Sequence, residues 1–113
     1  RAVLLYRADE NGIIFHTGKM KDLFNQLQTN PSVELCFYAP AINIQIRVEG
    51  KMELVDDLSL KQEIINHPSR VFMKDWVKKD PELSFFTVFR MKNGKAHVWT
   101  FADNFLPKKY VTL

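Results

Sequence analysis

The sequence lacks most of the features that mark a disulfide-bonded, metal-binding or membrane-spanning protein. Cys36 is the single cysteine among 113 residues, so no intrachain disulfide can form. The three histidines are scattered, and their spacing from Asp and Glu predicts neither a metal site nor a catalytic triad. No apolar run approaches the roughly 18 residues that span a bilayer. We therefore expect no resident metal and no membrane partner, and a lone cysteine in an apolar run fits a reducing cytoplasm.

Internal repeats, low-complexity tracts and linkers are also missing, which leaves a single domain over residues 1–113. The composition is ordinary for such a domain, with 46% hydrophobic and 26% charged residues. The net charge of +3 comes from 16 basic and 13 acidic residues spread along the chain, which suits one small anionic ligand. Lysine and arginine do not gather with the aromatic residues on one predicted face, so we expect no nucleic-acid partner.

The first residue, Arg1, lies inside an apolar run and follows no initiator methionine. A strand that starts without a preceding turn or cap predicts further residues upstream of it. We therefore expect that the domain lacks its N-terminal strand in this sequence.

Two strands and a helix are predicted in the first third of the chain. Residues 2–6 and 13–17 are rich in apolar and β-branched side chains and flank an Asn-Gly pair, which is typical of a tight antiparallel hairpin. Four apolar residues then repeat at i, i+3, i+4 and i+7 over about residues 19–28, which predicts one buried helix face that an Asn-Pro pair ends. Thr17 is a candidate N-cap of this helix.

The clearest alternation of apolar and polar residues runs over 42–54, and a shorter one covers 33–38. Each predicts a strand with one buried and one polar face. Gly50 keeps the phase of the long strand and predicts a bend of the kind found at barrel corners.

Two helices and a second hairpin complete the pattern. The aspartate pair at 56–57 can cap a helix that Pro68 ends, and Ser69 can start another. Residues 85–90 and 96–101 then flank a second Asn-Gly turn. The order is β-β-α-β-β-α-α-β-β, an α+β domain whose strand edges are best buried by curling into a small barrel.

About half the chain carries an ordered series of short motifs. They are Arg1-Ala2-Val3-Leu4-Leu5, a turn at Gly12, Phe15-His16-Thr17, Lys19 and Lys21, Gln26-Leu27, Asn30-Pro31, and Val48-Glu49-Gly50. Their order and spacing resemble the pyridoxamine 5'-phosphate oxidase-like flavoproteins, and most of all the short branch that includes nitroimidazole-resistance-type reductases. The resemblance implies an antiparallel Greek-key split β-barrel of about six strands with flanking helices. It also implies a homodimer that holds flavin mononucleotide (FMN) between its subunits.

The resemblance further implies which residues of one subunit bind the cofactor. These are Arg1, Val3, Leu4, His16, Thr17, Lys19 and Lys21. In the resembled proteins an arginine, a threonine hydroxyl and a lysine surround the flavin phosphate, and the strand that contains Val3 and Leu4 runs beside the ring. A phosphate dianion is well served by such cations and donors near a helix start.

Three further candidates lie later in the chain. Gln45 falls where relatives place a glutamine that approaches the flavin from the neighbouring subunit, and Arg47 lies on the same strand face. Trp99 ends the last predicted strand and can wall the flavin or the dimer seam. The cationic loop after Thr17 is rearranged and the C-terminal substrate segment of the oxidases is not recognisable. We therefore expect an FMN-dependent oxidoreductase acting on a different small organic substrate, with the redox chemistry carried by the flavin and the catalytic side chains unassigned.

One alternative stays open, a non-enzymatic flavin- or haem-binding carrier or sensor in which His16 or His67 ligates iron. Each candidate also has a plain structural reading. Arg1 can be an exposed terminal residue, and Trp99 an ordinary core or interface aromatic. Lys19 and Lys21 can be solvated, although a cation at a helix N-terminus is mildly unfavourable and a bound anion would relieve that mismatch.

Overall fold

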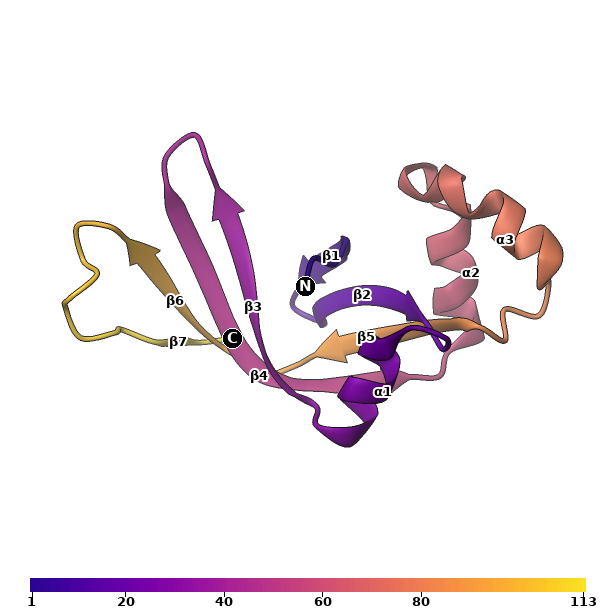
Figure 1. Ribbon diagram of the computed structural model, residues 1–113, viewed down its shortest axis with the longest axis horizontal. Helices are drawn as coiled ribbons and strands as arrows, with labels where there is room; N and C mark the ends of the chain where they lie inside the picture. Colours follow the sequence, from indigo (N-terminus) through magenta and orange to yellow (C-terminus); the bar gives the residue numbers. More distant parts are fainter.

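Antiparallel strands make up most of the molecule, and a computed structural model describes all of residues 1–113 (Figure 1). The elements in chain order are β1 (Leu5–Asp9), β2 (Gly12–Gly18), α1 (Asp22–Thr29), β3 (Ser32–Ala39), β4 (Ile44–Val55), α2 (Leu58–Asn66), the 3-10 helix η1 (Pro68–Met73), α3 (Lys74–Lys79), β5 (Phe86–Met91), β6 (Lys95–Thr100) and β7 (Val111–Thr112). The strands hydrogen-bond in the order β1-β2-β5-β4-β6-β7, and β3 pairs with β4. None of the helices is long and apolar enough to cross a membrane.

The two halves of the sheet share strand β4, which bends sharply (Figure 1). Over Ile44–Lys51 this strand pairs with β3, and over Met52–Val55 it pairs instead with β5. Gly50 lies just before this change of partner, and an added Cβ there would lie 2.9 Å from the sulfur of Met91 and 3.4 Å from the Cα of Gly94. The bend predicted at this glycine is confirmed (Figure 1), and the close approach of the segment between β5 and β6 explains why a side chain is disfavoured there.

Two apolar clusters pack against this sheet. Phe15 and Phe89 belong to the first cluster, and the apolar side of α1 packs against it. Ile14 belongs to the second, together with Ile64 of α2 and Met73 of η1. Because successive strand residues point to opposite faces, the adjacent residues 14 and 15 serve opposite clusters. The helices after β4 therefore cover one face of the sheet and α1 covers the other.

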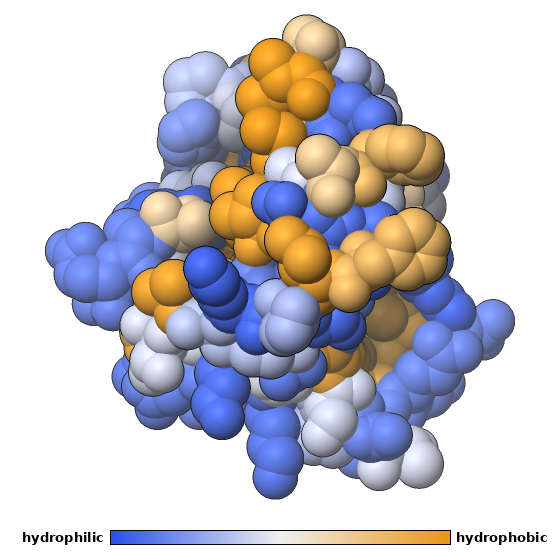
Figure 2. Space-filling model, turned by 90° about the vertical axis from the view of Figure 1, so that its left-hand side faces the viewer, coloured by the Kyte–Doolittle hydropathy of each residue, from blue (hydrophilic) through white to orange (hydrophobic).

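The first half of β4, with β3, β6 and β7, forms an arm that extends away from the helices (Figure 1). The molecule measures 50 × 31 × 26 Å with a radius of gyration of 15.8 Å, against about 13 Å for a compact chain of this length. Ile46 and Val98 are paired on β4 and β6 and are 45% and 60% exposed. Figure 2 looks at this end of the molecule and shows apolar residues gathered on it. The arm therefore carries an apolar face that the chain itself leaves uncovered.

The predicted fold class, an α+β antiparallel split barrel with flanking helices, is confirmed. The predicted order of strands and helices is also confirmed, and the structure adds the two-residue strand β7 in the tail. The predicted pairing of residues 85–90 with 96–101 in a second hairpin is wrong. Strands β5 and β6 do not pair with each other, because both run antiparallel to β4, β5 along Met52–Val55 and β6 along Ile44–Glu49. The first strand lies further along the chain than predicted, at Leu5–Asp9 rather than at 2–6. Its pairing with β2 has a register shift between Leu5 and Arg7, so the regular pairing of the two strands lies close to the turn.

The prediction that Thr17 caps the first helix is wrong. Strand β2 continues to Gly18, and within it Thr17 pairs with Thr87 of β5, whose hydroxyl donates a 2.7 Å hydrogen bond to the Thr17 carbonyl. Helix α1 begins at Asp22, and Lys21 holds the N-cap position without a side-chain cap. Pairing with β5 thus holds Thr17 in extended conformation, and the helix begins further along the chain.

The turn between β1 and β2 depends on Gly12, whose φ of 114° is disfavoured for other residues. A Cβ at this position would lie 2.5 Å from the backbone oxygen of Met91. We expect Gly12→Ala to lower the free energy of unfolding by about 1–3 kcal/mol, because the backbone would be strained and β5 displaced. Denaturant unfolding followed by circular dichroism measures the change. Asn11→Ala in the same turn is the control and should stay within about 0.5 kcal/mol of the wild type; equal losses in both variants would contradict the assignment.

Candidate functional site

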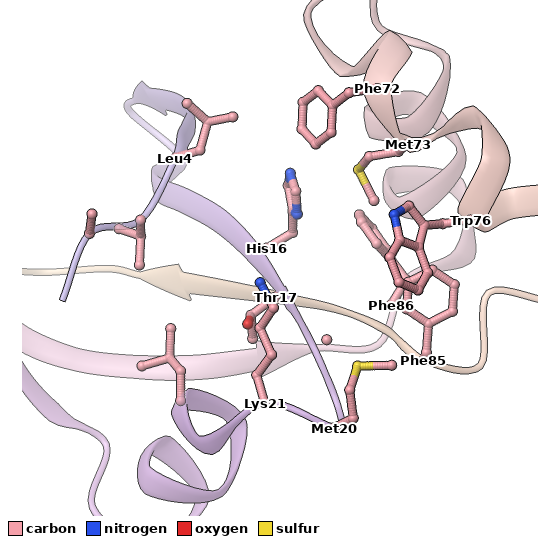
Figure 3. Close-up of a pocket in the computed structure, with 14 residues that line it drawn as sticks. Leu4, His16, Thr17, Met20, Lys21, Phe72, Met73, Trp76, Phe85 and Phe86 are labelled. Atoms are coloured by element: carbon pink, nitrogen blue, oxygen red, sulfur yellow. The ribbon is translucent and has the colours of Figure 1, made fainter.

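A cavity of about 350 Å³ opens between the end of β2, the segment that precedes β1, and the helices that follow β4 (Figure 3). Its volume falls in the range of small-molecule sites. Ten of its fourteen lining residues are hydrophobic, and none is acidic. The cavity is therefore a largely apolar hollow with a small number of polar groups, which is the usual composition of a cofactor or substrate site.

The polar groups meet near the end of β2. Lys21 is the single charged residue that lines the cavity, and Figure 3 shows its side chain running toward Thr17 and His16. The hydroxyl of Thr17 has no hydrogen-bond partner in the chain and is not sealed from solvent, so it faces the cavity. Helix α1 starts directly after Lys21 with no side-chain cap. An ammonium group, a hydroxyl and an uncapped helix start thus lie together, and each of them favours an anion.

The apolar walls come from two separate parts of the chain. Val3 and Leu4 form one side, ahead of β1. Phe72 of η1 and Trp76 of α3 form the other, and the Trp76 ring lies 6.1 Å from that of Phe85. Figure 3 shows the aromatic side chains facing Leu4 across the hollow. Walls of this composition suit a flat, ring-shaped ligand, because aromatic and aliphatic side chains contact ring faces well.

His16 lies on the wall of the cavity and is held by Arg70 of η1. The Nε of Arg70 donates a 3.0 Å hydrogen bond to the Nε2 of His16. Burial, followed by the charges of Arg70 and Lys21, lowers the pKa of His16 to about 4. His16 is therefore neutral at physiological pH.

Arg70 is a buried cation, 3% exposed, that forms no salt bridge with a carboxylate. Its other nitrogens donate to the hydroxyl of Ser69 at 2.8 Å and to the carbonyl of Leu5 at 3.0 Å. Its guanidinium lies 5.4 Å from the centre of the Tyr6 ring, which supplies a cation–π contact. An unneutralised charge of this kind raises the electrostatic potential around the neighbouring cavity, so the site as a whole favours a negatively charged ligand.

The structure brings half of the predicted cofactor-binding residues to this cavity. They are Val3, Leu4, His16, Thr17 and Lys21. Arg1 does not line it; its guanidinium donates to the Oε1 of Gln26 at 2.8 Å and borders a neighbouring hollow. Lys19 is exposed and also lies outside the cavity lining.

The remaining predicted residues, Gln45, Arg47 and Trp99, lie on the arm. Gln45 pairs with Trp99 across β4 and β6, and its Oε1 accepts a 3.0 Å hydrogen bond from the Nε of Arg47. Arg47 and Trp99 line a separate hollow of about 760 Å³ beside the C-terminal tail. The structure thus groups these residues on one polar face, away from the cavity of their own chain. Their approach to a flavin held by a neighbouring subunit stays a prediction.

Sequence reasoning missed Arg70 and the aromatic wall. Phe72 and Trp76 lie in the helical segment predicted after Ser69, and they are 60% and 55% exposed because they border the open cavity. Their spacing of four residues is the spacing of one helix face and was a usable signal, although in the structure they lie on the successive helices η1 and α3. Arg70 gave no local signal, because its partners His16 and Leu5 are far away in the sequence.

A curled antiparallel sheet with this cavity defines the class of the chain as a small split-barrel protein. The sequence model of the family described as pyridoxamine 5'-phosphate oxidase matches residues 1–100, and the chain belongs to that family. A putative pyridoxamine 5'-phosphate oxidase of Caenorhabditis elegans is 42% identical over 57 residues, which are 50% of this chain and 25% of the relative. The pyridoxine/pyridoxamine 5'-phosphate oxidase of Anaeromyxobacter dehalogenans is 30% identical over 79 residues, which are 70% of this chain and 40% of the relative. The matched part thus spans well under half of these curated relatives.

Solved structures show the same fold at low sequence identity. A NimC/NimA family protein of Clostridium acetobutylicum aligns with a TM-score of 0.71 at 17% identity, covering 96% of this chain and 70% of the other. An FMN-binding, pyridoxamine 5'-phosphate oxidase-related protein of Nostoc punctiforme aligns with a TM-score of 0.56 at 14% identity, covering 100% and 79%. A haem-binding protein of Mycobacterium smegmatis aligns with a TM-score of 0.54 at 15% identity, covering 95% and 44%. At these identities the likeness establishes the fold alone.

The lowered pKa of His16 predicts a pH dependence of stability. In the unfolded chain this histidine has its ordinary pKa of 6.5, and in the folded chain a pKa of about 4. Between these values the unfolded state binds more protons, so the contribution of His16 to the free energy of unfolding falls as the pH drops from 6.5 toward 4. Urea unfolding at pH 7 and pH 5 measures the loss. His16→Asn removes the titrating group and should lose less stability over this interval; equal losses in variant and wild type would contradict the assignment.

Proposed function

We propose that the chain binds FMN in the cavity at the end of β2 and works as an FMN-dependent oxidoreductase. One observation carries the proposal: an ammonium group, a free hydroxyl and an uncapped helix start converge at one end of a hollow whose remaining walls are apolar and aromatic. This arrangement suits a ligand with a phosphate at one end and a flat ring system at the other. FMN has that form, and membership of the family supports it as the ligand.

The phosphate would be held by Lys21, Thr17 and the backbone N–H groups of the first turn of α1. A phosphate prefers several fixed donors and a cation, and these groups are already in place in the folded chain. Arg70 adds a second positive charge nearby without lining the cavity itself. The site therefore attracts a dianion without any acidic residue in its lining to oppose it.

The ring would lie between the segment that contains Val3 and Leu4 and the aromatic wall of Phe72 and Trp76. A flavin supplies hydride or single-electron transfer when bound. The chain's own residues bind and orient the ring and exclude water from it. His16, neutral and fixed by Arg70, places one polar edge on an otherwise apolar wall. Few catalytic side chains are needed for such chemistry, which agrees with the absence of acidic residues from the lining.

A haem-binding role finds less support in the geometry. The Nε2 of His16 is engaged by Arg70, and the Nδ1 of His67 accepts a 3.1 Å hydrogen bond from the backbone N–H of Ser69. In each neutral histidine one ring nitrogen thus already accepts a hydrogen bond, and the other nitrogen carries the proton. Neither ring therefore offers iron a free lone pair. A flavin carrier without catalytic turnover stays the main alternative, and turnover of a reduced nicotinamide with a bound flavin separates an enzyme from a carrier.

A second copy of the chain would cover the exposed apolar face of the arm. The apolar face of the arm, with Ile46 and Val98, continues from the buried core at Val48 and is left uncovered by the chain itself. Association of two copies would bury this face, because apolar surface is driven out of water. Gln45 and Arg47 lie on the opposite, polar face of the same arm, and the family resemblance makes them the candidates for the part of the flavin site that the neighbouring subunit contributes.

Lys21→Ala tests the phosphate assignment. Loss of a charge-assisted hydrogen bond should weaken FMN binding about 10- to 100-fold, while the fold is unchanged because Lys21 is an exposed residue without a salt bridge. Quenching of flavin fluorescence on titration measures the affinity.

Lys19→Ala is the matched control, since it removes the same charge two residues away from a side chain outside the cavity lining. Its affinity for FMN should change less than about threefold, in keeping with the screening of exposed charges. Equal weakening by both variants would show a general charge effect, and no weakening by Lys21→Ala would count against the phosphate site.

Ile46→Lys tests the role of the arm. A charge on this apolar face would oppose its burial between two copies, so we expect the dimer dissociation constant to rise at least tenfold. Sedimentation equilibrium measures the association. Leu58→Lys, which alters a similarly exposed apolar residue on α2, is the control and should leave association unchanged. A wild-type chain that stays monomeric at micromolar concentrations would sink the dimer proposal.

A further inference from the structure

The imidazole of His16 has one occupied and one free nitrogen. The Nε of Arg70 lies 3.0 Å from the Nε2 of His16. An arginine side chain has only donors and stays charged in proteins, so the histidine nitrogen that it contacts must be the acceptor. In a neutral imidazole the proton then resides on the other nitrogen, Nδ1.

This second nitrogen opens to the cavity. The Nδ1 of His16 has no hydrogen-bond partner in the chain, and it is not among the buried polar atoms that lack one. It therefore has solvent access, and the residue lines the cavity described above. One face of the same ring packs near Phe86, with 5.0 Å between ring centres, which limits its rotation. The free N–H is thus held in a fixed place at the cavity wall.

From this geometry we infer that His16 is a ligand-contacting hydrogen-bond donor, and that Arg70 is the positioning residue that fixes its tautomer. The ligand group opposite His16 is an acceptor, a carbonyl or anionic oxygen or an unprotonated ring nitrogen. A ligand group that can only donate is excluded, because the acceptor nitrogen of the ring is already in use. The inference deepens the proposed function, since it assigns a contact to the ligand of that same cavity.

The charges around His16 keep this donor constant with pH. Arg70 from η1 and Lys21 ahead of α1 are the charged groups that act on it, and both oppose its protonation. The carboxylate of Glu63 on α2 accepts a 2.6 Å hydrogen bond from the Tyr6 hydroxyl and does not pair with Arg70. His16 therefore presents the same neutral N–H group throughout the physiological range, unlike an unperturbed histidine.

Nitrogen NMR of the ligand-free, ¹⁵N-labelled protein tests the tautomer. We expect the Nδ1 of His16 to carry the proton and the Nε2 to be unprotonated, with no titration between pH 5.5 and pH 8. Arg70→Met removes the donor and should release the ring, giving mixed tautomers or a titration in that range. Arg70→Lys keeps a donor and should preserve the wild-type pattern, so it serves if the methionine variant fails to fold. A wild-type ring protonated on Nε2 would overturn the inference.

FMN titration of two His16 variants tests the contact with the ligand. His16→Phe removes the donor and should weaken FMN binding about fivefold to tenfold, whereas His16→Asn keeps a donor near the same place and should lose less than about threefold. Equal FMN affinity of His16→Phe and wild type would overturn the contact and leave the proposed function intact. Failure of every form to bind FMN would instead overturn the proposed function, and the NMR result alone would then decide whether His16 presents the donor.

Discussion

The sharing of β4 between two sets of partners is the constraint on which the rest of the structure depends. One half of this strand closes the sheet that carries both apolar clusters, and the other half forms the arm. Gly50, just before the change of partner, has no room for a side chain, because the segment between β5 and β6 passes close to it. Once this bend is made, the end of β2 and the helices after β4 enclose a cavity, and the arm is turned outward as a separate apolar surface (Figure 1).

Much of the fold could be predicted from the sequence because its signals are local. Alternation of polar and apolar residues located β3 and β4, the Asn11-Gly12 pair located the first hairpin, and Asp57 does cap α2 by accepting from the N–H of Leu60. The Asn93-Gly94 pair misled, because the strands on either side of it both pair with β4. The start of α1 could not be predicted in this way. It depends on the pairing of Thr17 with β5, a partner 70 residues away in the sequence, and this ladder overrides the capping preference of a threonine.

The candidate site was predicted less completely than the fold, for a related reason. The motif residues at the end of β2 and ahead of β1 converge as the resemblance implied, since they are neighbours in one hairpin. Arg1 and Lys19 carry suitable charges but lie outside the cavity lining. The electrostatic character of the site depends instead on Arg70, whose contacts with His16 and Leu5 join distant segments and leave no periodic trace in the sequence.

The helices that wall the cavity occupy the connection between β4 and β5, which are adjacent antiparallel strands. Such a connection could be a short hairpin turn, and its replacement by a helical insertion leaves the strand order untouched. Insertions and exchanges in this segment can therefore accumulate during divergence without disturbing the barrel. Phe72 and Trp76 lie in this helical connection, whereas Thr17 lies in the sheet itself. The sheet thus carries the residues proposed to anchor a ligand, and the helical connection carries wall residues whose exchange would change which ligand fits.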